Sequence, residues 1–342
     1  MMKQTTVMLL FGGESSEHTV SISSARNVFA ALDDTEFEIL LCFISKDGKW
    51  FLLDSFDQTS DFASAPQLVP VLGSGSFMAM SDNRTFIPDV ILPILHGENC
   101  EDGTIQGLAK LLHIPIVGCG VAASAICMDK VFTKQLLEYN GIKTVPYAIH
   151  LISEKTPSFD QLSEKLGSVL FIKPVNCGSS VGINKATNDE ELRSALDEAH
   201  KFDSKVLIEQ AINARELEVG ILGSGENAAA SEVGEITPDE DFYTFESKYS
   251  ETSQSKVIIP ADIETDLSGE IRKIAVKAYR TIGCEGLSRV DFFFSDDETL
   301  YLNEINTLPG FTNISMYPKL WRHKGLSYSS LIKSLINNAL EK

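Results

Sequence analysis

Apolar, strand-like runs alternate with helical stretches over the first third of the chain. The runs read TTVMLLF, FEILLCFI, PDVILPIL and IPIVG, and helical periodicity lies between them at residues 21–32 and 104–113. Gly, Pro or Asp residues bound each segment. Because this alternation is typical of parallel, doubly wound sheets, we predict an α/β domain over residues 1–122.

The rest of the chain predicts two further lobes. A helical stretch at 121–141 leads into the second lobe, predicted for residues 123–212. The strands and helices that follow Pro146, around a Gly/Ser-rich loop, have the pattern of a small α+β unit. Residues 213–342 contain two strand-like runs, a polar stretch, a helix, a strand pair and a closing helix. We therefore expect three lobes, with boundaries near residues 122 and 212.

The chain is strongly acidic. It has 29 Lys and Arg residues against 48 Asp and Glu residues, which gives a formal net charge of −19. This charge repels a nucleic-acid backbone and an anionic membrane surface, so we expect neither nucleic acid nor membrane as a partner. A small anionic ligand stays compatible, because local basic residues and a bound cation can reverse the sign inside one cleft.

The N-terminal segment and the cysteines indicate a cytoplasmic protein. The start, MMKQTTVMLLFGGESSE, has one Lys and only a short apolar run, so we expect a first strand and neither a signal peptide nor a membrane span. The six cysteines form no C-x-x-C pair and have no zinc-finger spacing. Reduced thiols in the cytosol are the expectation.

Two strand-like segments near the C-terminus each place two polar side chains on one face. Arg289 and Asp291 stand two residues apart in LSRVDFFF. Glu304 and Asn306 do so in LYLNEIN. A four-residue loop at 296–299 would set Asp291 opposite Glu304, and the same register sets Arg289 opposite Asn306. Two carboxylates and an amide supply oxygen ligands of the kind that hold Mg²⁺.

A solvated polar face on a half-exposed sheet would explain the same pattern. The turn TLPGFT, directly after Asn306, favours the metal site. Gly310 in this turn lets the backbone approach a ligand closely, so its N–H could serve as an oxyanion donor. Arg289 could bind a carboxylate or an oxyanion beside the metal.

A glycine-bounded loop follows a strand end in the middle of the chain. Lys173-Pro174 ends an apolar run, and NCGSSVG follows at 176–182 before another strand. The N–H groups and hydroxyls of this loop, including Ser179 and Ser180, could wrap phosphates, with Lys173 as a point charge. The loop lacks the G-x-x-x-x-G-K-[ST] pattern, and an ordinary β-hairpin turn is the alternative interpretation.

Two glutamates flank the next connection. Glu209 ends the run VLIEQ, and Glu216 lies seven residues later. Their carboxylates could accept hydrogen bonds from an adenine amino group and from ribose hydroxyls. Two solvated glutamates are the alternative interpretation.

Three loops at strand ends or helix starts of the first domain also carry polar residues. GGESSEHTVS begins at Gly12 and lacks the dinucleotide pattern G-x-G-x-x-G. Glu17, near the start of a helix, suits a substrate ammonium better than a phosphate. HGENCEDG begins at His96, and Met128-Asp129-Lys130 opens a helix. Such loops collect binding residues in open α/β sheets, although His96 could equally be a satisfied loop histidine.

The motifs GGxSxE, HGxxxEDG, MDK, KPxxxGSSxG, IE, KY, SRxD and NExNTxPGFT occur here in this order, over almost the whole chain. This order resembles that of the D-alanine–D-alanine ligases, a family of the ATP-grasp superfamily. The resemblance implies an α/β ATP-grasp fold with two α+β lobes enclosing ATP. It also implies a two-step reaction, in which ATP phosphorylates the carboxylate of one D-alanine and the amine of a second attacks the acyl phosphate.

Carried over position by position, the resemblance assigns roles to individual residues. Glu17 would hold the first amino group, linked to Ser179 and Tyr249, and Arg289 with the Gly310 N–H would stabilise the tetrahedral oxyanion. The ATP set comprises Lys130, Lys173, Ser180 and Lys248 at the phosphates, Glu209 and Ile212 at the adenine, and Glu216 at the ribose. Asp291, Glu304 and Asn306 would bind two Mg²⁺ ions, for which Mn²⁺ could substitute. Ser315 and Met316, with His96 nearby, would seat the second substrate.

The resemblance has two further implications and three departures. The polar stretch at 237–255 is similar to the closing loop of the family, which would keep water away from the acyl phosphate. A homodimer is expected from the resemblance only. Thr19, Cys100 and the pair Asn176-Cys177 differ from the usual family residues. None has a proposed catalytic role, so they put loop geometry in question and not the reaction class.

The main alternative is a ligase of the same fold that takes D-serine or D-lactate second. This chain keeps Lys248-Tyr249, where the D-lactate enzymes depart. It has Ser315-Met316-Tyr317-Pro318 where the D-serine enzymes resemble S-R-[YF]-P. An apolar Met suits a methyl side chain better than a buried hydroxyl without a partner, so we expect D-alanine at both positions.

Two further alternatives are weaker, and the first comes from another class of protein. A nonenzymatic nucleotide-binding homologue would be expected to lose metal ligands or Arg289, and this chain keeps them all. An ATP-grasp ligase for a different carboxylate is disfavoured by Glu17 and Lys248-Tyr249, which belong to amino-acid handling in the family that the chain resembles.

Overall fold

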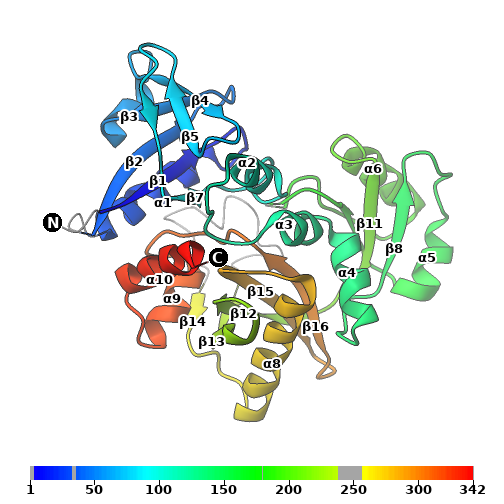
Figure 1. Ribbon diagram of the computed structural model, residues 1–342. Helices are drawn as coiled ribbons and strands as arrows, with labels where there is room; N and C mark the ends of the chain where they lie inside the picture. Colours follow the sequence, from blue (N-terminus) through cyan, green and yellow to red (C-terminus); the bar gives the residue numbers. More distant parts are fainter. Residues whose placement is uncertain (1–3, 33–35, 179, 238–255, 342) are drawn as a thin grey trace.

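The computed structural model describes residues 4–32, 36–178, 180–237 and 256–341. Its strands form three sheets, of seven, four and five strands. Figure 1 shows the N-terminal sheet in blue and cyan, the four-stranded sheet in green, and the five-stranded sheet from yellow-green to orange. The predicted mixture of an α/β domain with two further sheet-containing lobes is confirmed. No helix in the described ranges is long and apolar enough to cross a membrane.

The three strands at one end of the first sheet are parallel. Strand β1 (Thr5–Gly12) pairs in parallel with β2 (Phe37–Ile44) on one side and β7 (Val90–Ile94) on the other. The helices of this domain are α1 (His18–Ala31) and α2 (Thr104–Leu112). The parallel sheet that we predict is therefore confirmed for the strands whose ends carry the candidate loops.

The rest of this sheet is antiparallel, and its strands are absent from the prediction of a parallel, doubly wound sheet. The added strands are β3 (Trp50–Leu53), β4 (Gln67–Val71), β5 (Ser76–Ala79) and β6 (Thr85–Phe86), with the short 3₁₀ helix η1 (Phe56–Ser60) between β3 and β4. The connection between β2 and β3 is a tight turn, in which the Gly48 N–H donates to the Ser45 carbonyl. Such a short connection can join only antiparallel neighbours, because a parallel pair needs a long crossover.

The middle sheet is antiparallel and has its own core. Its strand order is β10 (Asn184–Ala186), β9 (Leu170–Pro174), β11 (Lys205–Gln210) and β8 (Tyr147–Leu151). Two helices, α5 (Phe159–Leu166) and α6 (Asp189–Ala199), pack their buried residues against it. Each helix begins at a capping residue, because Ser158 and Asn188 accept backbone N–H groups of the first turn.

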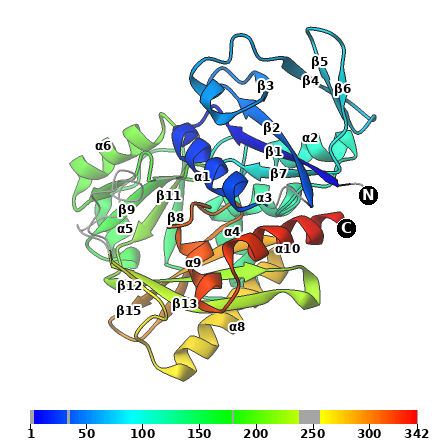
Figure 2. The ribbon, with the colours of Figure 1, turned by 90° about the vertical axis from the view of Figure 1, so that its left-hand side faces the viewer.

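The third sheet lies between helices. Its order is β14 (Lys256–Ile258), β13 (Ala229–Thr237), β12 (Ala214–Leu222), β15 (Leu287–Ser295) and β16 (Leu300–Asn306), and the short 3₁₀ helix η2 (Gly225–Asn227) joins β12 to β13. Figure 2 shows α8 (Thr265–Ile282) and α9 (Met316–His323) on opposite faces of this sheet. Helix α9 packs closely because Gly220 has no side chain: a Cβ there would lie 2.9 Å from Trp321 Nε1.

Two segments pack outside the lobes to which the predicted boundaries at 122 and 212 assign them. Helices α3 (Val121–Met128) and α4 (Lys130–Tyr139) contribute Ala123 and Leu137 to the core of the third sheet. Helix α10 (Tyr328–Leu340) contributes Leu331 and Leu335 to the core of the first domain, and Figure 2 shows it between the two sheets. The predicted ranges thus follow chain order, while the cores are shared across the boundaries.

Candidate active site

The β15–β16 hairpin has the two residue pairs that the sequence predicts, but its turn differs from the predicted four-residue loop. Asp291 lies opposite Glu304, and Arg289 lies opposite Asn306. A simple four-residue loop would pair Phe294 with Tyr301, but Phe294 pairs with Leu300 instead. An irregularity at the step from Asp291 to Phe292 restores the predicted pairs, which is the effect of a β-bulge.

Arg289 is held between two carboxylates. Its Nε and Nη2 donate to Asp291 at 2.8 and 2.7 Å, and its Nε lies 3.0 Å from a carboxylate oxygen of Glu218. Both acidic residues are buried. Burial disfavours the guanidinium charge, but Asp291 and Glu218 outweigh this effect and hold the pKa of Arg289 well above its ordinary range. The cation is therefore fixed beside the candidate metal ligands.

The oxygen ligands predicted for a cation lie together. The Asn306 amide nitrogen donates to Asp291 at 2.8 Å and to Glu304 at 3.4 Å. The amide therefore lies between the two carboxylates, in contact with both. No three His, Cys, Asp or Glu side chains within the described ranges gather as a metal site. Two carboxylates and one amide leave coordination positions for phosphate oxygens, which suits Mg²⁺.

Glu218 is a site residue that our sequence analysis missed. It lies opposite Asp291 on β12, and Glu216 stands two residues earlier on the same face of that strand. The run ELEVGIL carries the signal, since its two glutamates have the same spacing as Arg289 and Asp291. Only the pairing of β12 with β15 makes Glu218 a partner of Arg289, and that pairing joins distant parts of the chain.

A second charged cluster lies in the middle lobe. The Glu209 carboxylate is 2.6 Å from Lys134 Nζ and 2.5 Å from Lys173 Nζ. Burial alone would raise the pKa of Glu209, but the two lysines outweigh burial and lower it to about 2. Lys134 is absent from the predicted site, although it lies one helical turn after Lys130 in MDKVFTK. Ile212 and Glu216 follow Glu209 on the connection to β12 and on that strand.

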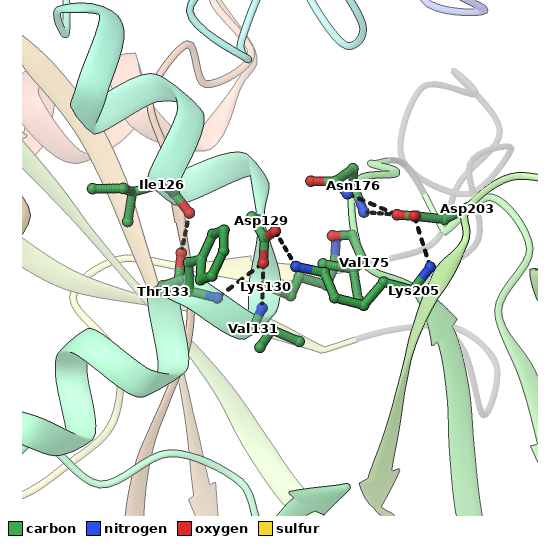
Figure 3. A network of polar contacts seen from close by, with 10 residues as sticks. Ile126, Asp129, Lys130, Val131, Thr133, Val175, Asn176, Asp203 and Lys205 are labelled. Atoms are coloured by element: carbon green, nitrogen blue, oxygen red, sulfur yellow. Dashed lines mark hydrogen bonds and ion pairs between the residues drawn. The ribbon is translucent and has the colours of Figure 1, made fainter. Parts of the chain in front are cut away.

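The start of the Gly/Ser loop is fastened to helix α4 and to the residues just before β11, and Figure 3 shows the second of these contacts, between Asn176 and Asp203. Lys130 Nζ donates to the Cys177 carbonyl at 2.6 Å. Asp129 caps α4 and forms an ion pair with Lys205, while Asp203 accepts both the backbone N–H and the amide of Asn176 at 2.8 Å. Burial lowers the pKa of Lys130, and Glu304 opposes this effect, so the loop lies within reach of the hairpin's charge.

Of four further predicted site residues, the structure describes one. Ser180, in the same loop, has a φ of 60°. Ser179, Lys248 and Tyr249 lie outside the described residues, as does the predicted closing loop from residue 238 to 255.

The first domain brings Glu17 and His96 to the same place. Glu17 is 7% exposed, and a Cβ on Gly97 would lie 3.5 Å from its Oε2. Gly97 has a φ of 75°, so this close approach suits glycine. His96 Nδ1 lies 3.2 Å from the Leu308 carbonyl, which connects this loop to the TLPGFT turn. Burial would lower the pKa of His96, but Glu101 and Glu17 outweigh burial and raise it.

The turn after β16 gathers one of the two residues predicted for the second substrate. A Cβ on Gly310 would lie 3.2 Å from Ser315 Oγ, which also accepts the Thr312 N–H at 3.1 Å. Met316 is placed differently. Its side chain is buried with Ile236 and Leu320 in a small apolar cluster between α9 and β13.

Comparison with known proteins gives consistent matches. The family model described as D-ala D-ala ligase N-terminus matches residues 6–119, and the model described as D-ala D-ala ligase C-terminus matches residues 136–337. D-alanine–D-alanine ligase A of Escherichia coli (strain K12) is 43% identical over 354 residues, which cover 100% of this chain and 97% of that protein. D-alanine–D-alanine ligase of Clostridium novyi (strain NT) is 45% identical over 349 residues, covering 98% of both.

Two solved structures have similar folds. The D-alanine-D-alanine ligase from Coxiella burnetii gives a TM-score of 0.89 at 33% identity, covering 99% of this chain and 94% of that one. The VanG D-Ala:D-Ser ligase from Enterococcus faecalis gives a TM-score of 0.90 at 32% identity, covering 98% and 100%.

Proposed function

The chain belongs to the D-alanine–D-alanine ligase family, and we propose that it joins two D-alanine molecules into D-alanyl-D-alanine at the expense of ATP. The ATP-grasp fold of the family encloses the nucleotide between the middle and third sheets. The observation that carries the proposal is the β15–β16 hairpin, which sets Asp291 opposite Glu304 beside Arg289 and runs into the Gly310 turn. The product would serve peptidoglycan precursor synthesis.

The ATP site that we propose uses helix α4, strands of the middle and third sheets, and connecting segments. Lys130, Lys173, Ser180 and Lys248 would hold the phosphates, Glu209 and Ile212 the adenine, and Glu216 the ribose. The position of Lys130 against the Gly/Ser loop supports this assignment, because its ammonium already binds a loop carbonyl. Phosphoryl transfer depends mainly on positioning and on neutralisation of charge, which such cations supply.

The family uses a divalent cation with its ATP. We propose two Mg²⁺ ions, for which Mn²⁺ could substitute, held by Asp291, Glu304 and Asn306. When bound, Mg²⁺ would neutralise charge on the phosphate oxygens. The residues fit this role because their three oxygen-bearing side chains share one face of the hairpin.

The chain's residues would then guide two bond-forming steps. A carboxylate oxygen of the first D-alanine attacks the γ-phosphorus of ATP, and ADP leaves. The amine of the second D-alanine attacks the acyl carbon, a C–N bond forms, phosphate leaves as the C–O bond breaks, and the nitrogen loses a proton. Arg289 and the Gly310 N–H would stabilise the oxyanion of this second step. Glu17 would hold the first ammonium, supported by Ser179 and Tyr249.

Glu17→Gln should raise the KM for the first D-alanine about 10-fold to 100-fold, because a charge-assisted hydrogen bond contributes roughly 1.5–3 kcal/mol. The KM for ATP should change less than about twofold, since the ammonium is bound apart from the nucleotide. Rates at varied D-alanine concentration, fitted to two D-alanine sites, give the KM for the first D-alanine. Rates at varied ATP concentration give the KM for ATP. Glu14→Gln is the matched control, because exposed Glu14 contacts Asn99 on the same side of the domain. An equal rise in both KM values would remove Glu17 from the substrate site.

The second substrate is the finer part of the proposal. We propose D-alanine, with Ser315 and His96 lining its subsite and Met316 fixing the start of α9 from the core side. Relatives at 42–45% identity are named D-alanine–D-alanine ligases, whereas the D-Ala:D-Ser ligase structure is 32% identical. A D-serine or D-lactate ligase of the same fold is the alternative.

Coupled ADP release tests the activity and the second substrate together. With Mg²⁺ present, D-alanine alone should support turnover and L-alanine should not. With D-alanine in the first site, kcat/KM for a second D-alanine should exceed that for D-serine by at least about 10-fold, because a pocket shaped for a methyl group discriminates against an added hydroxyl by up to roughly 100-fold. A preference for D-serine or D-lactate would overturn the assignment. We also propose that the protein is cytoplasmic and forms a homodimer. Sedimentation of the purified protein would test the dimer.

A further inference from the structure

We infer that Lys134 is a positioning residue: it keeps Glu209 paired, so that Lys173 can leave that carboxylate and turn to the nucleotide phosphates. The inference rests on the proposed function, which assigns Glu209 to the adenine and Lys173 to the phosphates. Lys134 itself would touch neither the adenine nor the phosphates. Its effect on ATP passes through Glu209.

Lys134 is held from three sides. Its side chain is 2% exposed, and its Nζ lies 2.6 Å from Glu209 Oε1. The same ammonium donates to the Val145 carbonyl at 3.2 Å and lies 5.3 Å from the centre of the Tyr147 ring. A buried ammonium that contacts a carboxylate, a carbonyl and an aromatic face would lose all three interactions if it moved. Lys134 is therefore the fixed partner of Glu209.

Lys173 is the partner that can move. Its side chain is 15% exposed, against 2% for Lys134, and it lies near the end of β9, directly before the Gly/Ser loop. It is 2.5 Å from the other Glu209 oxygen. A lysine in this position faces the phosphates only if it gives up part of its contact with Glu209. The two roles proposed for Lys173 and Glu209 are therefore in competition.

Glu209 needs a counter-charge when Lys173 turns to the phosphates, and Lys134 supplies it. A carboxylate buried without a partner carries a large penalty, so a single lysine beside Glu209 would be held there. With Lys134 fixed on one oxygen, Glu209 keeps a counter-charge when Lys173 turns away. Helix α4 then serves the nucleotide site twice, through Lys130 at the Gly/Ser loop and through Lys134 one turn later.

Lys134→Met tests the inference. We expect the KM for ATP to rise about 10-fold or more, because Lys173 must then stay with Glu209, while the KM for D-alanine changes less than about twofold. Adding Glu209→Gln should reverse part of this rise, because a neutral amide no longer holds Lys173. If Lys134 contacted ATP directly, Glu209→Gln would not lower the KM for ATP of the Lys134→Met variant. Lys201→Met is the matched control, since Lys201 is exposed in the same lobe and pairs with exposed Glu198.

Three outcomes would overturn the inference: a KM for ATP within twofold of the wild type, an equal rise for D-alanine, or a double variant worse than either single one. Thermal melting of all variants shows whether each is folded, and the double variant keeps the test open if Lys134→Met alone is not. Calorimetric binding of a non-hydrolysable ATP analogue to the same proteins needs no D-alanine turnover. A wild type without D-alanine-dependent ADP release would thus sink the proposed function while the analogue still tests Lys134.

Discussion

Replacing both Asp291 and Glu304 with alanine is expected to lower kcat at least about 1,000-fold. The two carboxylates face each other across the β15–β16 hairpin, and no third acidic side chain in the described ranges completes a metal site with them. Losing both would remove the anchoring of the divalent cation. Charge stabilisation by a bound metal amounts to several kcal/mol, and roughly 4 kcal/mol corresponds to a factor of 1,000 in rate.

Steady-state ADP release at increasing Mg²⁺ concentration measures this loss. The control is Asp266→Ala with Glu270→Ala, which makes the same change of charge at exposed positions on α8 of the same lobe. The control should keep wild-type kcat within about twofold, because exposed charges away from the site contribute little. A folded Asp291/Glu304 double variant with kcat within tenfold of the wild type would refute the metal site and the proposal built on it.

The hairpin shows how far sequence patterns reach. Polar residues at a spacing of two fix which face of a strand they occupy, so the shared face of Arg289, Asp291, Glu304 and Asn306 follows from the sequence. The bulge does not, because it depends on how the strands coil against their neighbours. The prediction of the pairs is correct because the short turn and the bulge offset each other.

The missed elements have local causes. Strands β3 to β6 are short, between two and five residues, and lack a long apolar run. Helix α9 has Pro318 at its third position. A proline inside a segment predicts the end of a helix, so the sequence alone does not indicate one there. In the structure, this proline lies within the first turn, where its missing N–H leaves no bond unmade.

The missed charges have long-range causes. Lys134 meets a glutamate 75 positions later, and Glu218 meets an arginine 71 positions later, so no spacing along the chain connects either pair. The Glu218 partner follows from sheet order, which places β12 beside β15. The Lys134 partner follows from the packing of α4 against β11, where Val131 and Leu207 lie in one hydrophobic cluster. Motifs identify residues that contact ligands, whereas the residues that hold those groups in place become visible only with the tertiary structure.

Replacing Arg289 with methionine is expected to lower kcat about 100-fold to 1,000-fold, the loss seen when one oxyanion donor is removed. It should also destabilise the fold by roughly 3–5 kcal/mol, because Asp291 and Glu218 would remain buried without their shared cation. Arg289→Lys keeps the charge but not the planar fork that reaches both carboxylates, so we expect an intermediate loss. Thermal melting and ADP release measure the two effects separately.

The dependence on Mg²⁺ distinguishes a donor to the oxyanion from a residue that only orients Asp291. If Arg289 acts on the oxyanion, Arg289→Lys lowers kcat at saturating Mg²⁺ and leaves the half-saturating Mg²⁺ concentration within about threefold of the wild type. If it only orients Asp291, high Mg²⁺ restores kcat and the half-saturating concentration rises instead. Glu218→Gln is the matched control, because it changes the other contact of Arg289 and leaves Asp291 in place. Recovery of kcat by excess Mg²⁺ would therefore contradict the role proposed for Arg289.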